Sequence, residues 1–224
     1  SVPRLDGIRA EMSAIDRLLR RREVGLAAEK ITLVVSRLED LFQQLPKSGA
    51  LDDSLRLKLS YLAAQIDRLG GIQDLVYDGL RPLPGVAERQ LLRTEFPQDL
   101  YLQIMRVNPS RNAGRAFPVD SVNWHEAMGA CERLSWILAR PVRLPTIDEF
   151  RVAVGDPSKV DLLANDATVS QPMASQAANE WGFSELLGNL AEWLSTPAQE
   201  DPTLASVGGG MSWAQPGIPR GGGV

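Results

Sequence analysis

The residue types that carry out most protein chemistry are scarce in this chain of 224 residues. Cys131 is its only cysteine and His125 its only histidine. A single cysteine excludes a disulfide or a thiol pair within the chain, and one residue of each type cannot make a Cys-rich zinc site or a two-histidine metal motif. His125 stands beside Glu126 with no second base or nucleophile nearby in the sequence, so we expect a surface histidine.

One polar motif has a clear structural meaning. Residues 143–150 read R-L-P-T-I-D-E-F, in which Thr146 is followed three residues later by Glu149. That spacing is typical of a capping box, where the hydroxyl and the carboxylate each satisfy a free backbone N–H at the start of a helix. We interpret the motif as structural and not catalytic.

Composition and charge exclude several classes of function. The chain is 44% hydrophobic and 23% charged, which is ordinary for a globular protein, and its net charge of -4 gives no basic field for nucleic acid. A cationic cluster interrupted by leucines is expected to be a solvated helix face: Arg17, Arg20, Arg21 and Arg22. Apolar runs fall short of the roughly 20 residues that cross a membrane, and the start of the chain lacks a signal peptide's apolar stretch. These features indicate a cytoplasmic protein or a mature exported one.

The first third of the chain has helical periodicity. Apolar residues recur at alternating spacings of three and four in two sets, which are Ile31, Val34, Leu38, Leu41 and Leu45, then Leu55, Leu59, Leu62, Ile66 and Leu69. Each set lines one face of a helix. Residues 46–49, P-K-S-G, interrupt the pattern, which predicts two antiparallel helices joined by a short loop. An earlier stripe suggests that the first helix is long or broken near Gly25: Ile8, Met12, Ile15 and Leu19.

A composition change marks the predicted domain boundary. Gly79, Pro82, Pro84 and Gly85 cluster within seven residues, so we place a helical region at residues 1–80 and a second domain at 86–224. The second domain alternates short elements with turns, which predicts an α+β protein. The helical hairpin either packs on the rest of the protein or serves as a dimerisation element.

A further helix is predicted from about residue 124 to residue 139. Its apolar face would carry Ala127, Cys131, Leu134 and Leu138. Cys131 on that face is expected to be a core residue and not a reactive thiol.

Three sequence blocks together resemble the formylglycine-generating-enzyme family, also called sulfatase-modifying factors. The first comprises N-P-S at 108–110 and F-P-V-D-S-V-N-W-H-E-A at 117–127, the second is R-L-P-T-I-D-E-F at 143–150, and the third is W-G-F-S-E-L-L-G-N-L-A-E-W at 181–193. Residues 94–105 resemble the family's first helix, and G-G-M-S-W at 209–213 resembles its later G-G-S-W motif. The resemblance implies a C-type-lectin-like domain with little regular secondary structure.

The sequence departs from the family at the positions that carry catalysis. Members that oxidise a sulfatase cysteine use two cysteines near the carboxyl end, where copper binds, and this chain has no cysteine after Cys131. Ergothioneine-biosynthesis relatives bind iron through histidines of a helical domain, and residues 1–80 contain no histidine. Compared with the family, the chain has therefore lost the ligands of both metals, and we expect a pseudoenzyme without catalytic residues.

One family feature is retained. Members bind calcium in the third block through backbone carbonyls and one glutamate, which correspond here to Leu187, Gly188, Leu190 and Glu192. Oxygen ligands of this kind suit a hard cation that tolerates irregular geometry. Local capping or pairing of Glu192 is the alternative. A second family calcium site would use the region of Asn165 and Asp166, where the loop is shortened.

These inferences favour a binding or regulatory protein. Degenerate members of the family include TagR-like periplasmic regulators that act with a transmembrane Ser/Thr kinase in bacterial type VI secretion, so the expected partner is the kinase's extracytoplasmic part, with homodimerisation as a further possibility. The alternative is a formylglycine-generating or related metal-dependent oxidase whose catalytic residues lie outside the sequence shown. A ligand-binding domain of the diversity-generating type is disfavoured, because residues 208–213 are not followed by an Asn-, Tyr- and Ser-rich stretch.

Overall fold

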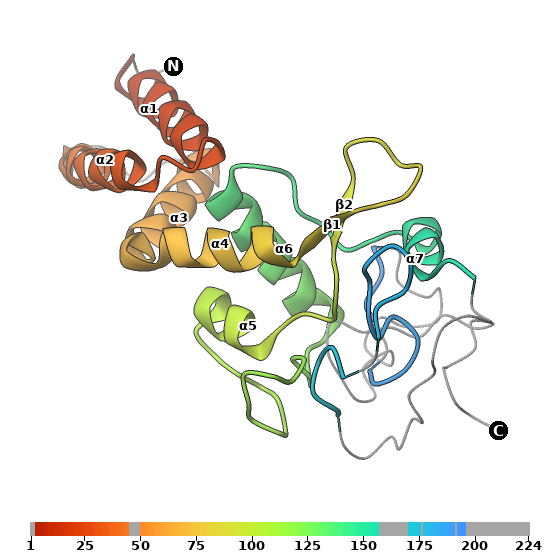
Figure 1. Ribbon diagram of the computed structural model, residues 1–224. Helices are drawn as coiled ribbons and strands as arrows, with labels where there is room; N and C mark the ends of the chain where they lie inside the picture. The colour runs from red at the N-terminus through yellow and green to blue at the C-terminus, as the bar shows by residue number, and fades with distance from the viewer. Residues whose placement is uncertain (1–2, 45–49, 157–169, 176, 191, 196–224) are drawn as a thin grey trace. The chain divides into compact units, whose positions relative to one another are not determined.

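The computed structural model describes residues 3–44, 50–156, 170–175, 177–190 and 192–195 (Figure 1). The chain forms two compact units. The first unit comprises Ser1–Asp74 and Glu132–Val142, and the second comprises Leu75–Cys131 and Arg143–Val224. Helices predominate, and the one sheet of the described residues has two strands, so the fold is α+β.

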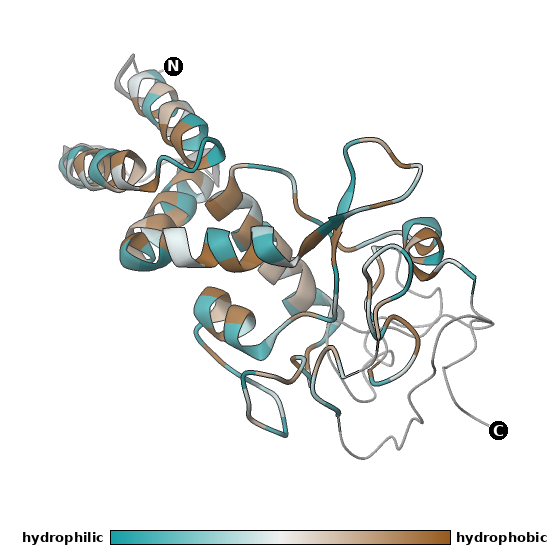
Figure 2. Cartoon of the chain, viewed as in Figure 1, coloured by the Kyte–Doolittle hydropathy of each residue, from teal (hydrophilic) through white to brown (hydrophobic). Residues whose placement is uncertain are grey.

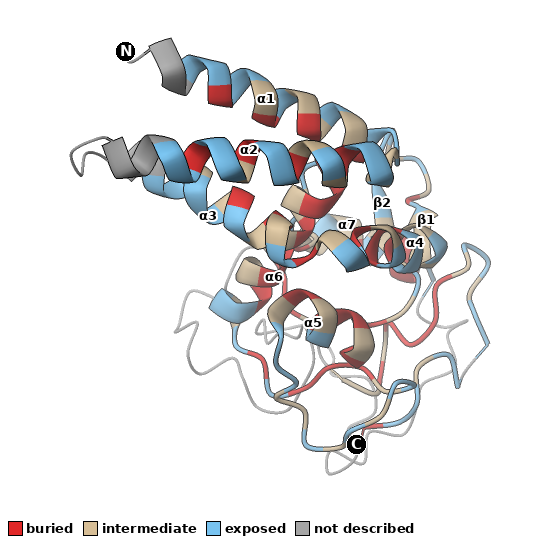
Figure 3. Ribbon diagram, turned by 90° about the vertical axis from the view of Figure 1, so that its left-hand side faces the viewer, coloured by how far each residue is buried: buried red, intermediate tan, exposed pale blue. Residues whose placement is uncertain are grey.

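The first unit is helical. Its helices are α1 (Pro3–Arg20), α2 (Val24–Gln44), α3 (Ala50–Ala64), a short 3₁₀ turn (Ile66–Arg68), most of α4 (Leu69–Gly79) and the end of α6 (Trp124–Leu138). Helix α2 packs against both α1 and α3, and the buried positions of α1 lie along the side that faces α2 (Figure 3).

The predicted apolar stripes form the core of this unit. Figure 2 shows apolar residues alternating with polar ones along these helices. The buried members are Ile8, Met12, Ile15, Leu19, Ile31, Val34, Leu38, Leu59, Leu62 and Leu69, whereas Leu55 and Ile66 are half-buried. The side chain of Leu41 and all of Leu45 lie outside the described residues. The leucines that the first unit exposes are on other helix faces: Leu26, Leu33 and Leu57. The buried stripe on α2 is therefore unavailable as a dimerisation surface.

The first helix breaks slightly earlier than Gly25, which lies inside α2. Arg22 adopts a left-handed conformation with φ of 62°, and its N–H donates to the Leu19 carbonyl at 3.0 Å. The N–H of Glu23 donates to the Leu18 carbonyl at 2.9 Å. This pair of bonds is the Schellman arrangement that closes a helix, and it ends α1 although no glycine occupies the left-handed position.

A buried amide joins three helices of the first unit. Gln73 of α4 is fully buried, and its Nε2 donates to the carbonyl oxygens of Leu19 at 3.0 Å and Ile137 at 2.9 Å. Both carbonyls lie in the last turn of a helix, where backbone acceptors lack intrahelical partners. Gln73 thereby ties the ends of α1 and α6 to α4.

The second unit contains a small hairpin, helices and irregular segments. Strand β1 (Leu80–Pro82) pairs antiparallel with β2 (Gln90–Leu92), with Leu80 opposite Leu92. Helix α5 (Gln98–Met105) follows a bridge between Pro97 and Pro118, and α7 (Ile147–Val154) is the last helix of the described residues. The Gly- and Pro-rich segment at 79–85 thus contains β1 and the start of the hairpin turn. None of the helices in the described ranges has the length and apolar character that a bilayer crossing requires.

Candidate functional site

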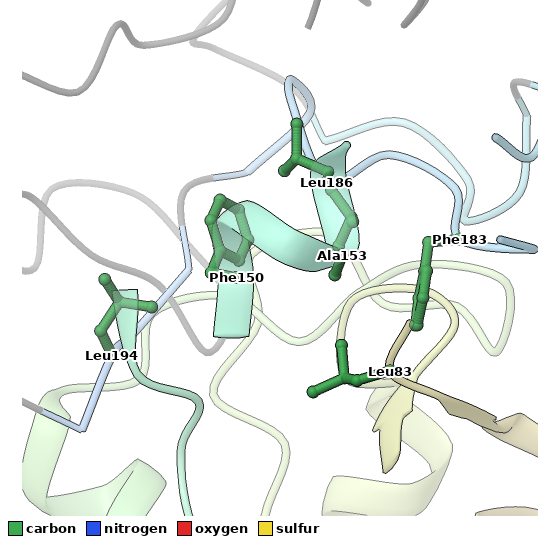
Figure 4. Close-up of a cluster of buried hydrophobic side chains, with 7 residues drawn as sticks. Leu83, Phe150, Ala153, Phe183, Leu186 and Leu194 are labelled. Carbon is green, nitrogen blue, oxygen red and sulfur yellow. The ribbon is translucent and has the colours of Figure 1, made fainter. Parts of the chain in front are cut away.

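A hydrophobic cluster anchors the segment that carries the predicted metal ligands. Its members come from the β-hairpin, from α7 and from residues 183–194: Leu83, Phe150, Ala153, Val154, Phe183, Leu186 and Leu194. Figure 4 shows all of them except Val154 with labels. The neighbouring Trp193 is buried, and its Nε1 donates to the Val122 carbonyl at 2.9 Å. The loop at 187–192 is therefore held by buried apolar residues on both sides.

The capping box predicted at residues 146–149 starts helix α7 and is confirmed in both directions. Arg143 adds two hydrogen bonds to the Glu149 carboxylate, each of 2.7 Å. The hydrogen bonds from Arg143 are the largest cause that lowers the pKa of Glu149 to about 2, and the backbone N–H of Thr146 adds to them. This motif orients α7, whose Phe150, Ala153 and Val154 pack in the cluster.

The backbone of the loop bends sharply. Glu185 and Asn189 have positive φ angles of 61° and 50°, and Gly188 has a φ of 122°, a conformation that favours glycine. The amide of Asn189 accepts from the N–H of Gln171 at 2.7 Å and donates to the carbonyl of the same residue at 3.1 Å. These bonds fasten the loop to residues 170–175.

Glu185 is a buried carboxylate with its hydrogen bonds satisfied. It accepts from the backbone N–H groups of Ala174 and Ser175 and from the Ser175 hydroxyl, each at 2.7 Å. Its task is structural, because it fixes the segment that Asn189 also contacts.

Two other carboxylates in the same region are not satisfied. Glu95 lies between β2 and α5 and is 6% exposed; its Oε1 accepts from the N–H of Leu190 at 3.4 Å, and its Oε2 has no hydrogen-bond partner. Glu192 is half-buried as a residue, but its Oε1 is shielded from solvent and also has no partner. Burial raises the pKa of Glu192 well above its usual range, and repulsion from Glu95 adds to this. The pKa of Glu95 is raised mainly by burial and secondarily by Glu185.

The predicted metal residues thus lie together on one anchored loop. Gly188 is buried, Leu187 and Leu190 are half-buried, and the side chain of Glu192 presents a free buried oxygen. An orphaned carboxylate oxygen beside an irregular backbone fits an oxygen-ligated cation such as calcium. The described residues contain no group of three or more His, Cys, Asp and Glu side chains arranged around a metal. Any cation here would depend on backbone oxygens as well as carboxylates.

Glu95 was not among the residues that the sequence singled out. Its only sequence signal is its place at the start of residues 94–105, which resemble the family's first helix. The predicted second calcium region around Asn165 and Asp166 and the G-G-M-S-W segment at 209–213 lie outside the described residues.

The single cysteine and the single histidine of the sequence lie in helix α6. Cys131 is buried in α6, as predicted, and burial raises the pKa of its thiol to about 12, which keeps it un-ionised at neutral pH. His125 is exposed at the start of the same helix, as predicted. Its ring packs edge-on against that of Trp124, with the ring centroids 5.2 Å apart.

Comparisons with known proteins give little. Neither a protein-family model nor a curated protein matches the sequence. Among solved structures, variable protein 1 of Treponema denticola is similar over 52% of this chain and 68% of its own, with 18% sequence identity and a TM-score of 0.40.

Proposed function

We propose that this protein is a non-catalytic recognition or regulatory protein whose second unit is a degenerate domain of the formylglycine-generating-enzyme type, with a calcium ion on the Leu187–Glu192 loop. The observation that carries the proposal is the contrast between its ionisable groups. The thiol of Cys131 is buried and un-ionised, whereas buried carboxylate oxygens without partners gather at the loop where the family resemblance implies calcium.

The calcium would act on structure. Glu192 and the carbonyl oxygens of Leu187, Gly188 and Leu190 would hold the ion, which when bound neutralises buried negative charge. The loop's neighbours would then present a fixed surface to a protein partner, in the way that lectin-like domains display loops on a rigid base. We place the partner in the periplasm, as the extracytoplasmic part of a Ser/Thr kinase that controls a type VI secretion system.

The partner is testable by affinity capture from a bacterial source with the full chain as bait. Recovery of the extracytoplasmic part of a kinase with the wild-type chain, and its loss with a variant bearing two charged substitutions in the loop, Leu187→Asp with Leu190→Asp, supports the proposal. The control bait carries Glu88→Gln, an exposed substitution in the hairpin turn. Equal capture by all baits, or capture of no kinase, contradicts this partner.

A separate assay tests the proposal that the protein does not convert cysteine to formylglycine. The full chain is incubated with a Cys-containing sulfatase peptide, copper and oxygen, and the mass of the peptide is measured by mass spectrometry. We expect no conversion of the cysteine to formylglycine, since Cys131 is buried and no second cysteine exists in the chain. A peptide with the mass of the aldehyde product would overturn the pseudoenzyme assignment.

The calcium proposal is tested by thermal unfolding. Calcium at about 100 times its dissociation constant stabilises a folded protein by roughly 2.7 kcal/mol, which a melting curve detects easily. The wild type is expected to melt at a higher temperature with calcium than with chelator, and Glu192→Ala is expected to lose that difference. A wild type that does not respond to calcium excludes the site.

A further inference from the structure

Glu95 reaches the candidate calcium loop from a distant part of the sequence. Its Oε1 accepts a hydrogen bond from the N–H of Leu190, a residue 95 positions later in the chain. The contact fixes where the Glu95 carboxyl group lies: against the backbone between the predicted ligands Gly188 and Glu192.

This arrangement leaves buried carboxylate oxygens without protein partners. Glu95 is 6% exposed, and one oxygen of Glu95 and one of Glu192 are buried without a hydrogen-bond partner. Among the described residues, no Lys or Arg forms an ion pair with either carboxylate. Burying an ionised carboxylate without a partner costs several kcal/mol, so such a pair is uncommon unless something neutralises it.

The surroundings of the two carboxyl groups suit an oxygen-ligated cation. The Glu95 carboxyl group contacts Leu190, and Glu192 follows it, in a loop whose backbone is bent by positive φ angles at Gly188 and Asn189. Carboxylate oxygens from two segments next to an irregular backbone are a typical environment for calcium, which accepts six to eight oxygens in flexible geometry.

We propose that Glu95 supplies a second carboxylate ligand to the cation on the Leu187–Glu192 loop, which makes it a two-carboxylate calcium site joining the start of α5 to that loop. This inference rests on the calcium part of the proposed function. It adds a ligand from outside the third sequence block, and it explains why a buried acid precedes Phe96 and α5. Magnesium fits less well, because it demands near-ideal octahedral geometry.

The test measures binding directly in the full chain. Calcium affinity is obtained by calorimetry, and terbium luminescence excited through the tryptophans, of which Trp193 is the nearest in sequence to Glu192, gives an independent value. The variants are Glu95→Gln and Glu192→Gln, which keep the side-chain shape and remove the charge. The matched control is Glu180→Gln, an exposed acid that precedes the loop by several residues.

We expect Glu95→Gln and Glu192→Gln each to weaken calcium binding at least tenfold, while Glu180→Gln binds like the wild type. Without calcium, Glu95→Gln should melt no lower than the wild type, since its amide oxygen can still accept from the N–H of Leu190, and this separates ligand loss from misfolding. Glu95→Asp keeps the charge on a shorter arm, and its affinity should fall between those of the wild type and Glu95→Gln.

The outcomes separate this inference from the proposed function. Wild-type affinity in Glu95→Gln, with weak binding in Glu192→Gln, overturns the role of Glu95 and leaves the calcium loop intact. A wild type that binds neither calcium nor terbium overturns both. If Glu95→Gln fails to fold, the Glu95→Asp variant decides the matter, because wild-type affinity in that variant shows that the position of the carboxylate is immaterial and contradicts direct ligation.

Discussion

Thr146 and Glu149 hydrogen-bond to each other in both directions at the start of α7. The N–H of Glu149 donates to Thr146 Oγ1 at 3.2 Å, and the N–H of Thr146 donates to Glu149 Oε2 at 2.8 Å. Because α7 places Phe150, Ala153 and Val154 in the hydrophobic cluster, this small motif helps to position the residues that anchor the candidate site.

Replacing Thr146 with alanine should destabilise the protein by about 1 kcal/mol, the usual cost of losing an N-cap side chain. The measurement is urea unfolding followed by circular dichroism. Thr146→Ser, which keeps the hydroxyl, should lose much less. Equal stability of the alanine variant and the wild type would mean that the cap contributes nothing.

The loss of stability at acidic pH should depend on Glu149. Its pKa is lowered from 4.5 to about 2 in the folded protein, first by hydrogen bonds from Arg143, so the folded state favours the charged form. A carboxylate of this kind contributes stability above pH 4.5 and loses it as the pH falls towards 2. Glu149→Gln should therefore be less stable at pH 7 and should lose less stability between pH 4.5 and 2. Unfolding at a series of pH values measures this. The control is the exposed Asp148→Asn. If Glu149→Gln loses as much stability as the wild type between pH 4.5 and 2, the prediction is wrong.

Gln73 should be a sensitive position in the first unit. Gln73→Met fills a similar volume but leaves the Ile137 carbonyl without its side-chain donor, whereas the Leu19 carbonyl keeps its bond from Arg22. An unsatisfied buried acceptor costs about 1–3 kcal/mol, and chemical denaturation should show a loss in that range. The neighbouring exposed Asp74→Asn should change stability by less than about 0.5 kcal/mol. A neutral Gln73→Met would show that the bridge between helix ends is dispensable.

A charged substitution should have different effects on stability on the two faces of α2. Leu38 is 5% exposed and Leu33 is 48% exposed. Leu38→Glu places a charge in the core and should destabilise the first unit by several kcal/mol, whereas Leu33→Glu should be nearly neutral in a melting experiment. Light scattering of the wild type and Leu33→Glu then reports whether the exposed face supports self-association. A Leu38→Glu variant with wild-type melting would mean that the stripe is not core.

Local features of this protein could be predicted from the sequence because neighbouring residues produce them. Spacings of three and four placed Ile15, Ile31 and Leu62 on buried helix faces, and the Thr146–Glu149 spacing gave the capping box. A second box of the same kind, between Asn123 and Glu126 at the start of α6, was equally readable and was missed. The break predicted near Gly25 lies at residues 21–23, where the left-handed residue is Arg22 and a favourable pair of backbone bonds outweighs its strain.

The sequence by itself thus determined helix faces and a helix start, whereas the tertiary structure alone decided which distant residues meet. It brought Glu95 against Leu190, and it brought Gln73 to the ends of α1 and α6. It also completed the first unit with Glu132–Val142 from a much later part of the chain. Periodicity and capping are set by neighbours within one or two helical turns, but burial of a lone polar group depends on long-range packing, which no local pattern records.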